Sequence, residues 1–153
     1  MEPGKWHVAQ LNIAKMKGKN IDDPVMKDFV KQLDTINALA EASMGFVWRL
    51  KADDGNATSY NPYGDDRIII NFSVWESADS LKNFVYKSAH TEVMKDRKQW
   101  FDNFNQAYYV FWNVPAGQVP SLDEATERLA YLQQHGASAY AFDFKNIFEP
   151  LIL

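Results

Sequence analysis

The stretch from Arg67 to Phe101, RIIINFSVWESADSLKNFVYKSAHTEVMKDRKQWF, constrains the fold most, because it joins a very apolar strand to a long amphipathic helix through one capped turn. The strand alternates between two faces, and only one of them is purely apolar. The apolar set is Ile68, Ile70, Phe72 and Val74, and the mixed set is Ile69, Asn71, Ser73 and Trp75. Such a strand is too hydrophobic for either face to meet water, so the mixed face predicts a covered cavity with a polar lining.

The helix after this strand is predicted from its cap and its periodicity. Ser77 stands at the N-cap position, and Asp79 places a negative charge at the positive end of the helix dipole. Residues spaced three or four apart then predict one stripe that packs on the sheet. This stripe contains Leu81, Phe84, Val85, Ser88, Ala89 and Glu92. Tyr86, His90 and Arg97 follow a different stripe, so His90 shares the core face only if the helix breaks near it.

The other elements are predicted from the same kinds of pattern. They are a strand over His7–Ala14, a helix from Asp22 or Asp23 to Gly45, a strand over Phe46–Lys51, a strand over Ala107–Pro115, and a helix from Ser121 to Gly136. Residues 136–153 form an apolar C-terminal arm, which we expect to lie on the same chain or on a partner subunit. Residues 1–153 are expected to form one domain.

The order strand, helix, strand, strand, helix, strand predicts an α+β fold of the ferredoxin-like type, a split β-α-β with an antiparallel sheet covered by helices on one face. If the helices cover the apolar sets, the mixed sets share the second face. They are Gln10, Asn12, Asn71, Ser73, Trp75, Tyr109, Phe111 and Asn113, with Arg49 as a further candidate. This face is too aromatic to be left in water. We therefore expect two such sheets to face each other in a homodimer and to enclose a pocket.

Composition excludes several classes of function. The net charge of −4 provides no basic stripe for nucleic acid. The chain has no cysteine, which excludes disulfide frameworks and thiolate chemistry. No apolar run approaches the roughly 20 residues of a membrane span, and the first residues lack an apolar signal segment. We expect a soluble, cytoplasmic protein without a membrane partner.

Several of these segments together resemble a known superfamily. A strand ending in VWES that leads into a helix with an aromatic residue and then a histidine resembles the dimeric α/β-barrel superfamily, which includes antibiotic-biosynthesis and haem-degrading monooxygenases. The chain is most similar to a branch called domain of unknown function 3291, through AQLNIA, FVWRL, SVWES, FVYKSAH and VPAG, over about residues 7 to 135. The resemblance implies a homodimer with a pocket for an aromatic or quinone-like small molecule.

The similarity to the haem-degrading members extends to single residues. Those proteins carry an axial histidine late in the same helix, in a segment that residues 86–90 resemble, so His90 would be the iron ligand. Asn12 matches their asparagine on the first strand. They also have a tryptophan within the helix, whereas this chain has Phe84 at the corresponding place and a helix about one turn shorter before the histidine.

Three functions stay open at this point. The first is a cofactor-independent monooxygenase or related isomerase, in which the substrate activates oxygen itself or loses a proton to His90. The second is a haem-binding protein with His90 as the axial ligand, so the cofactor is either haem or none. The third is a non-catalytic dimerisation module whose aromatic face is packed without a cavity.

The candidate residues have distinct chemistry. His90 supplies an imidazole for iron or for general-base catalysis, and Asn12 supplies an amide for a bound oxygen or an enolate. Arg49 and Arg97 are able to hold a carboxylate. The predicted ligand-binding residues are Trp75, Asn71, Ser73, Tyr86, Phe84, Tyr109, Phe111, Asn113, Arg49 and Arg97. Haem aside, no metal site is expected, because three scattered histidines show no zinc-ligand spacing.

Overall fold

The computed structural model describes residues 5–51, 60–87 and 97–149. In chain order its elements are β1 (Trp6–Met16), the 3-10 helix η1 (Pro24–Met26), α1 (Lys27–Ala42), β2 (Phe46–Arg49), β3 (Ile68–Trp75), α2 (Ala78–Lys87), α4 (Arg97–Trp100), β4 (Phe101–Asp102), β5 (Tyr109–Pro115) and α5 (Leu122–His135). The predicted order of strands and helices is confirmed, with the short β4 as an addition.

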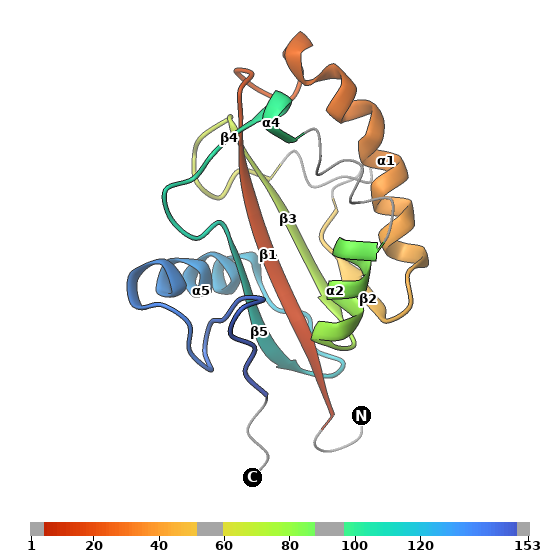
Figure 1. Cartoon of the computed structure of the whole chain (residues 1–153), viewed down its shortest axis with the longest axis vertical. Coiled ribbons are helices and arrows are strands. Elements are labelled where there is room, and N and C mark those ends of the chain that lie inside the picture. Colours follow the sequence, from red (N-terminus) through yellow and green to blue (C-terminus); the bar gives the residue numbers. More distant parts are fainter. Residues whose placement is uncertain (1–4, 52–59, 88–96, 150–153) are drawn as a thin grey trace.

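The strands form one antiparallel sheet with β1 in its middle (Figure 1). The order is β2-β3-β1, and both β4 and β5 pair with the other side of β1. The register runs from Val8 opposite Trp75 to Lys15 opposite Ile68 on the β3 side. With β5 as the fourth strand, this is the strand order of the predicted ferredoxin-like fold.

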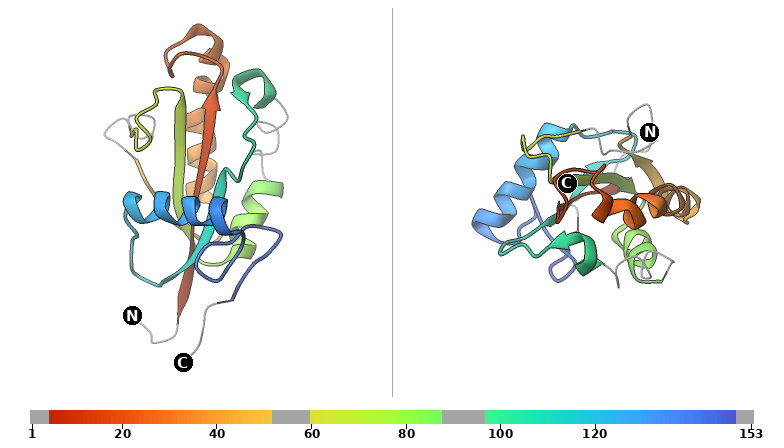
Figure 2. Two further views of the ribbon diagram at one scale, coloured as in Figure 1. Left: turned by 90° about the vertical axis from the view of Figure 1, so that its left-hand side faces the viewer. Right: turned by 90° about the horizontal axis from the view of Figure 1, so that it is seen from above.

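Helices cover both faces of the sheet, and this corrects the predicted arrangement. The mixed face lies under α1 and α2, through contacts of Trp75 with Phe84 and of the same cluster with Ala40. The purely apolar face packs against α5 instead, through Leu129 and Leu132. Figure 2 shows α5 on one side of the sheet, with α1 and α2 on the other. The mixed face is therefore covered by helices of its own chain and is not the face that two sheets would share in a dimer.

The helix caps follow the predicted side-chain chemistry. Asp23 accepts a hydrogen bond from the backbone of Val25 before η1, and Ser121 accepts one from the backbone of Glu124 in the first turn of α5. At the start of α2, the Ser77 hydroxyl accepts from the backbone of Ser80. These caps place the helices where the sequence signals predict them.

Several element ends differ from the predictions. β1 continues to Met16, which is buried with Met26, Trp100 and Phe101 in a separate cluster. α1 ends at Ala42 with Ser43 as its C-cap, so Gly45 lies in the following turn rather than at the helix end. Phe101 belongs to β4, which pairs with the end of β1. The predicted long second helix is seen as α2 and α4, and residues 88–96 between them lie outside the described part of the chain.

The C-terminal arm, as far as the structure describes it, lies on its own chain. Phe111 and Phe142 exchange two backbone hydrogen bonds of 2.8 and 2.9 Å across the free edge of β5. The Asn113 amide also donates to the backbone carbonyl of Phe148 at 2.9 Å. Ala141 and Phe142 are fully buried, so the apolar arm packs against the sheet of its own chain at β5.

Gly45 gives the first prediction. Its φ of +87° is a conformation that side chains rarely adopt, and a Cβ there would overlap the Ser80 side chain. Gly64 also has a positive φ, +66°, but a Cβ there would meet no described atom within 4 Å. We expect Gly64→Ala to lower the free energy of unfolding by about 1–2 kcal/mol, and Gly45→Ala by about 3 kcal/mol or more because steric overlap is added to strain. Urea denaturation of both variants tests this, and equal losses would contradict it.

Candidate functional site

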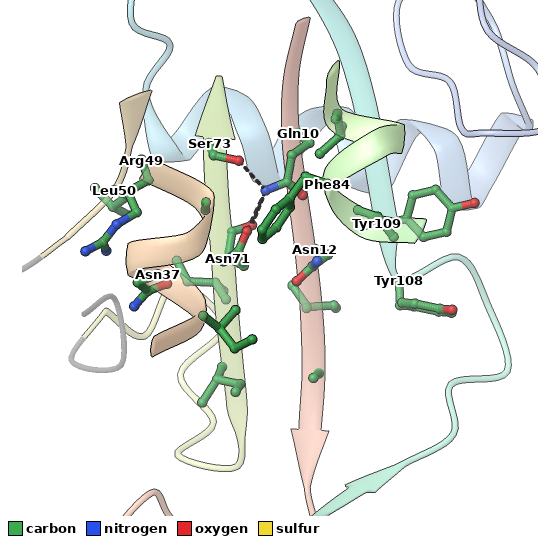
Figure 3. Close-up of a pocket in the computed structure, with 18 of the residues that line it drawn as sticks. Gln10, Asn12, Asn37, Arg49, Leu50, Asn71, Ser73, Phe84, Tyr108 and Tyr109 are labelled. Carbon is green, nitrogen blue, oxygen red and sulfur yellow. Dashed lines mark hydrogen bonds between the residues drawn. The ribbon is translucent and has the colours of Figure 1, made fainter. Parts of the chain in front are cut away.

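A pocket of about 610 Å³ lies between the mixed face of the sheet and helices α1 and α2 (Figure 3). Its size falls within the range of about 300–1,000 Å³ that is usual for small-molecule sites. The sheet supplies the floor, the two helices supply most of the walls, and Phe144 from the C-terminal arm closes part of one side. The covered, polar-lined cavity predicted for this face is present in the described structure.

The register of the strands arranges the floor in rows. One row contains Arg49, Ser73, Gln10 and Phe111, and the next contains Asn71, Asn12 and Tyr109. On one side these rows are flanked by Phe46, Trp75 and Val8, and on the other by Ile69 and Ala14. We call Gln10, Asn12, Asn71 and Ser73 the polar band. A ligand lying across the floor therefore meets a polar strip between two apolar strips.

A β-bulge in β2 brings Arg49 to this face. Phe46 pairs with Trp75 and Trp48 pairs with Val74, so the register shifts between Phe46 and Trp48. Arg49 consequently pairs with Ser73 on the pocket side, while Trp48 packs against Phe72 on the opposite face. A regular strand would place Arg49 and Phe46 on opposite faces, and the bulge places them on the same one.

Hydrogen bonds among the side chains of the sheet hold the polar band in place. The Gln10 Nε2 atom donates to Ser73 Oγ at 2.7 Å and to Asn71 Oδ1 at 2.6 Å, and Trp75 Nε1 also donates to Ser73 Oγ, at 2.9 Å. Gln10, Ser73 and Trp75 are all buried. Because buried polar groups are stabilised by being paired, these bonds hold the band in one arrangement.

Two members of the band remain available to a ligand. Asn71 is exposed in the pocket and accepts from Gln10 through Oδ1, which leaves its Nδ2 group to donate elsewhere. Asn12 is half-buried, and its side-chain amide makes no hydrogen bond to any residue in the described ranges. Figure 3 shows both amides on adjacent strands of the floor. The band thus presents hydrogen-bond donors to whatever lies above it.

Aromatic rings form much of the wall. Phe84 of α2 stacks on Trp75 at a centroid distance of 5.2 Å. The ring centroid of Phe144 lies 4.5 Å from that of Phe111, 5.7 Å from that of Tyr109 and 5.4 Å from that of Tyr86. Phe144 thus joins the arm to both β5 and α2. Burial raises the pKa of the Tyr109 hydroxyl, which keeps this group protonated at neutral pH. These walls suit a flat aromatic ligand.

The charges that line the pocket have one sign. Arg49 stands at the β2 edge of the sheet, and Arg97 lies at the opposite edge, over the rings of Phe101 and Tyr108 at 5.8 and 5.3 Å. Among the lining residues that the structure describes, none is Asp, Glu or His. The pocket therefore favours ligands with acceptor oxygens or negative charge.

The structure brings together most of the residues predicted as a site. Asn12, Asn71, Ser73, Trp75, Phe84, Tyr86, Tyr109, Phe111, Arg49 and Arg97 all line the pocket. Asn113 shares the sheet face but lies outside the lining, where it holds the arm. His90 is outside the described residues, so its predicted roles as base or iron ligand stay predictions. Ligand binding by the other residues stays a prediction too.

Sequence reasoning missed some of the residues that line the pocket. Gln10 was placed on the correct face but not recognised as the centre of the network. Asn37 and the apolar side of α1 also line the pocket, and the helical stripe of α1 was a signal for this once the helix was assigned to the mixed face. Phe144 had no signal, because the arm has neither clear helical nor strand periodicity.

The described part of the chain shows neither a metal-ligand cluster nor a membrane-spanning helix. It contains no group of three or more His, Cys, Asp or Glu residues placed to hold a metal ion. Of the helices there, none is long and apolar enough to cross a membrane.

Comparison with known families decides the relationship. The family described as domain of unknown function DUF3291 matches residues 7–151, nearly the whole chain. The chain belongs to this family. The match confirms the resemblance and extends it from the last helix through the described part of the arm. A comparison with curated proteins found no match.

Solved structures resemble this chain at low sequence identity. A conserved protein from Methanosarcina mazei Go1 is similar with a TM-score of 0.51 and 10% identity, over 72% of this chain and 93% of that one. SnoaB, a cofactor-independent oxygenase from Streptomyces nogalater, gives a TM-score of 0.45 and 15% identity, over 74% and 95%. A putative antibiotic biosynthesis monooxygenase from Chloroflexus aurantiacus J-10-fl gives 0.45 and 14%, over 76% and 98%. At these identities, the first similarity supports the fold alone.

The network around Ser73 gives the second prediction. Ser73→Ala removes the acceptor of two buried donors, and we expect it to lower the free energy of unfolding by about 2 kcal/mol. Trp75→Phe removes one of those donors, so Ser73→Ala should cost about 1 kcal/mol less in that background. Denaturation of wild type, both single variants and the double variant measures this coupling. Strictly additive losses would contradict the network.

The position of Phe144 gives the third prediction. Phe144→Ala removes three ring contacts that hold the arm, so the amide hydrogen of Phe142 should exchange faster with solvent. Phe148→Ala is the matched control in the same arm, since Phe148 is 37% exposed and contacts only the ring of Phe142 among the described aromatic residues. Hydrogen-exchange mass spectrometry compares the two. A larger effect of Phe148→Ala would show that Phe144 does not anchor the arm.

Proposed function

We propose that this protein binds a planar, aromatic or quinone-like small molecule in the pocket between the sheet and helices α1 and α2. The observation that carries the proposal is the polar band, which lies between apolar strips on the floor of a 610 Å³ pocket. A flat ring system fills the apolar strips, while its oxygen atoms accept hydrogen bonds from the band.

The free donors support a ligand with carbonyl or phenolic oxygens. Asn71 Nδ2 and the Asn12 amide lie in one cross-strand row, so both reach the same part of a flat ligand. The buried Gln10 and Ser73 hold Asn71 in place and keep its donor toward the pocket. The aromatic walls then provide ring contacts on both sides of the ligand plane.

The same donors support a chemical role for the pocket. Amide groups aimed at a ligand oxygen stabilise the negative charge that develops when a phenol or ketone loses a proton. A substrate in this state is able to react with dioxygen without a cofactor. For anthrone, the ring CH₂ becomes a carbonyl with one oxygen atom, and the two hydrogens leave with the other oxygen atom as water. This is the monooxygenase-like reaction that we propose for this protein.

Binding of naphthoquinones and anthrone gives the fourth prediction. Menadione should quench tryptophan fluorescence saturably, because Trp75 lines the pocket, and the absence of cysteine prevents thiol adducts. Asn71→Leu removes one donor and should weaken binding by about 3- to 10-fold. Asn105→Leu, at an exposed position outside the lining, is the matched control and should leave the affinity unchanged.

Oxygen consumption in the same titration, with anthrone as the ligand, separates turnover from binding alone. Absence of saturable quenching by any quinone or by anthrone would overturn the proposed function. Equal affinities of wild type and Asn71→Leu would be compatible with ligand binding in the pocket. They would contradict a role of the polar band in that binding.

A further inference from the structure

The guanidinium of Arg49 is incompletely paired. Its Nε atom is buried and has no hydrogen-bond partner among the described residues, and the side chain is only 11% exposed. Within residues 5–51, 60–87 and 97–149, its ion pair is a contact of 3.4 Å between Nη2 and Glu41 Oε1, and the Glu41 side chain is itself 42% exposed on α1. Buried donors in native proteins are nearly always paired, so a guanidinium with an unpaired N–H group, on a residue that lines the pocket, is suited to a further acceptor.

The backbone geometry of β2 places Arg49 on the pocket face of the sheet. The bulge in β2 sets Arg49 directly opposite Ser73 and beside the polar band. Ser73 Oγ already accepts two hydrogen bonds, from Gln10 and Trp75, so its own hydrogen is left to donate. Arg49 and Ser73 therefore start from paired backbone positions at the same end of the band.

The charges around the pocket leave the guanidinium without a strong internal counter-ion. In the described lining, both charged side chains are arginines. Arg97 already contacts the faces of two rings at the far edge, whereas Arg49 retains a buried N–H for which the described part of the chain supplies no acceptor. An arginine binds a carboxylate through parallel N–H groups, which include Nε.

We infer that the ligand of this pocket is an aromatic organic anion, and that its carboxylate binds Arg49 at the β2 end of the polar band. This inference rests on the proposed function and adds the charge and the orientation of the ligand. Glu41 then competes with the ligand carboxylate for Arg49, because the Glu41 carboxylate contacts the same guanidinium and is partly exposed to solvent. Arg49 is the residue that distinguishes an acidic ligand from its neutral analogue.

The test compares two ligands of nearly the same shape in two proteins. Anthraquinone-2-carboxylate and anthraquinone-2-carboxamide are titrated into wild type and Arg49→Gln, with tryptophan quenching as the readout. Wild type should bind the carboxylate at least about tenfold more tightly than the carboxamide, which is the usual strength of a charge-assisted hydrogen bond. Arg49→Gln should bind both ligands with similar affinity.

Two further variants make the assignment specific. Arg128→Gln changes the net charge equally, but Arg128 lies on α5, outside the pocket lining, and so should keep the preference for the carboxylate. Glu41→Gln removes the competitor and should strengthen carboxylate binding without affecting the carboxamide. This variant keeps the inference testable if Arg49→Gln does not fold.

The outcomes separate this inference from the proposed function. Equal binding of both ligands to wild type overturns the inference and leaves the proposed function intact. Binding of neither ligand, together with no binding of menadione or anthrone, overturns both. Loss of the preference in Arg97→Gln but not in Arg49→Gln would place the carboxylate at the other edge and overturn the assignment.

Discussion

The hydrogen-bonded register of β1 with β3 on one side and β5 on the other determines the rest of this structure. Because β1 is central, each of its residues from Val8 to Asn12 has a partner on both β3 and β5. A shift of one residue on either side would exchange the two faces of that strand and remove the polar band. The large apolar cluster on the opposite face, with Leu11 and Trp112 fully buried, opposes any such shift. The apolar core on one face of the sheet thus maintains the strand register that forms the pocket floor on the other face.

Much of the fold was predictable because strand alternation has a strict period of two. The sets of residues that share a face were inferred correctly, from Gln10 and Asn12 through Asn71 and Ser73 to Tyr109 and Phe111. Which face receives the helices was not predictable from that pattern. It depends on the handedness of the connections between strands, and alternation carries no information about handedness. The expectation that helices cover only the purely apolar face failed for this reason: α5 lies on that face, and α1 and α2 lie on the mixed one.

The site was predictable to the extent that it lies on regular strands and helices. Arg49 was an open case, because a bulge breaks the alternation and leaves no clear mark in the sequence of a four-residue strand. Phe144 was out of reach, since its position depends on how the arm meets β5. Gln10 was underestimated because its importance comes from hydrogen bonds to two residues, Asn71 and Ser73, that lie beside it only in the folded sheet.

The bridge between Phe111 and Phe142 has a consequence for how the protein behaves at high concentration. Exposed sheet edges act as templates for strands of other molecules, and proteins avoid aggregation by keeping such edges short, irregular or covered. Here the arm occupies the edge of β5, and the opposite edge is β2, which is short and bulged. Neither of these edges offers a long, regular row of free backbone groups. The arm that helps to close the pocket therefore also protects the sheet against intermolecular strand addition.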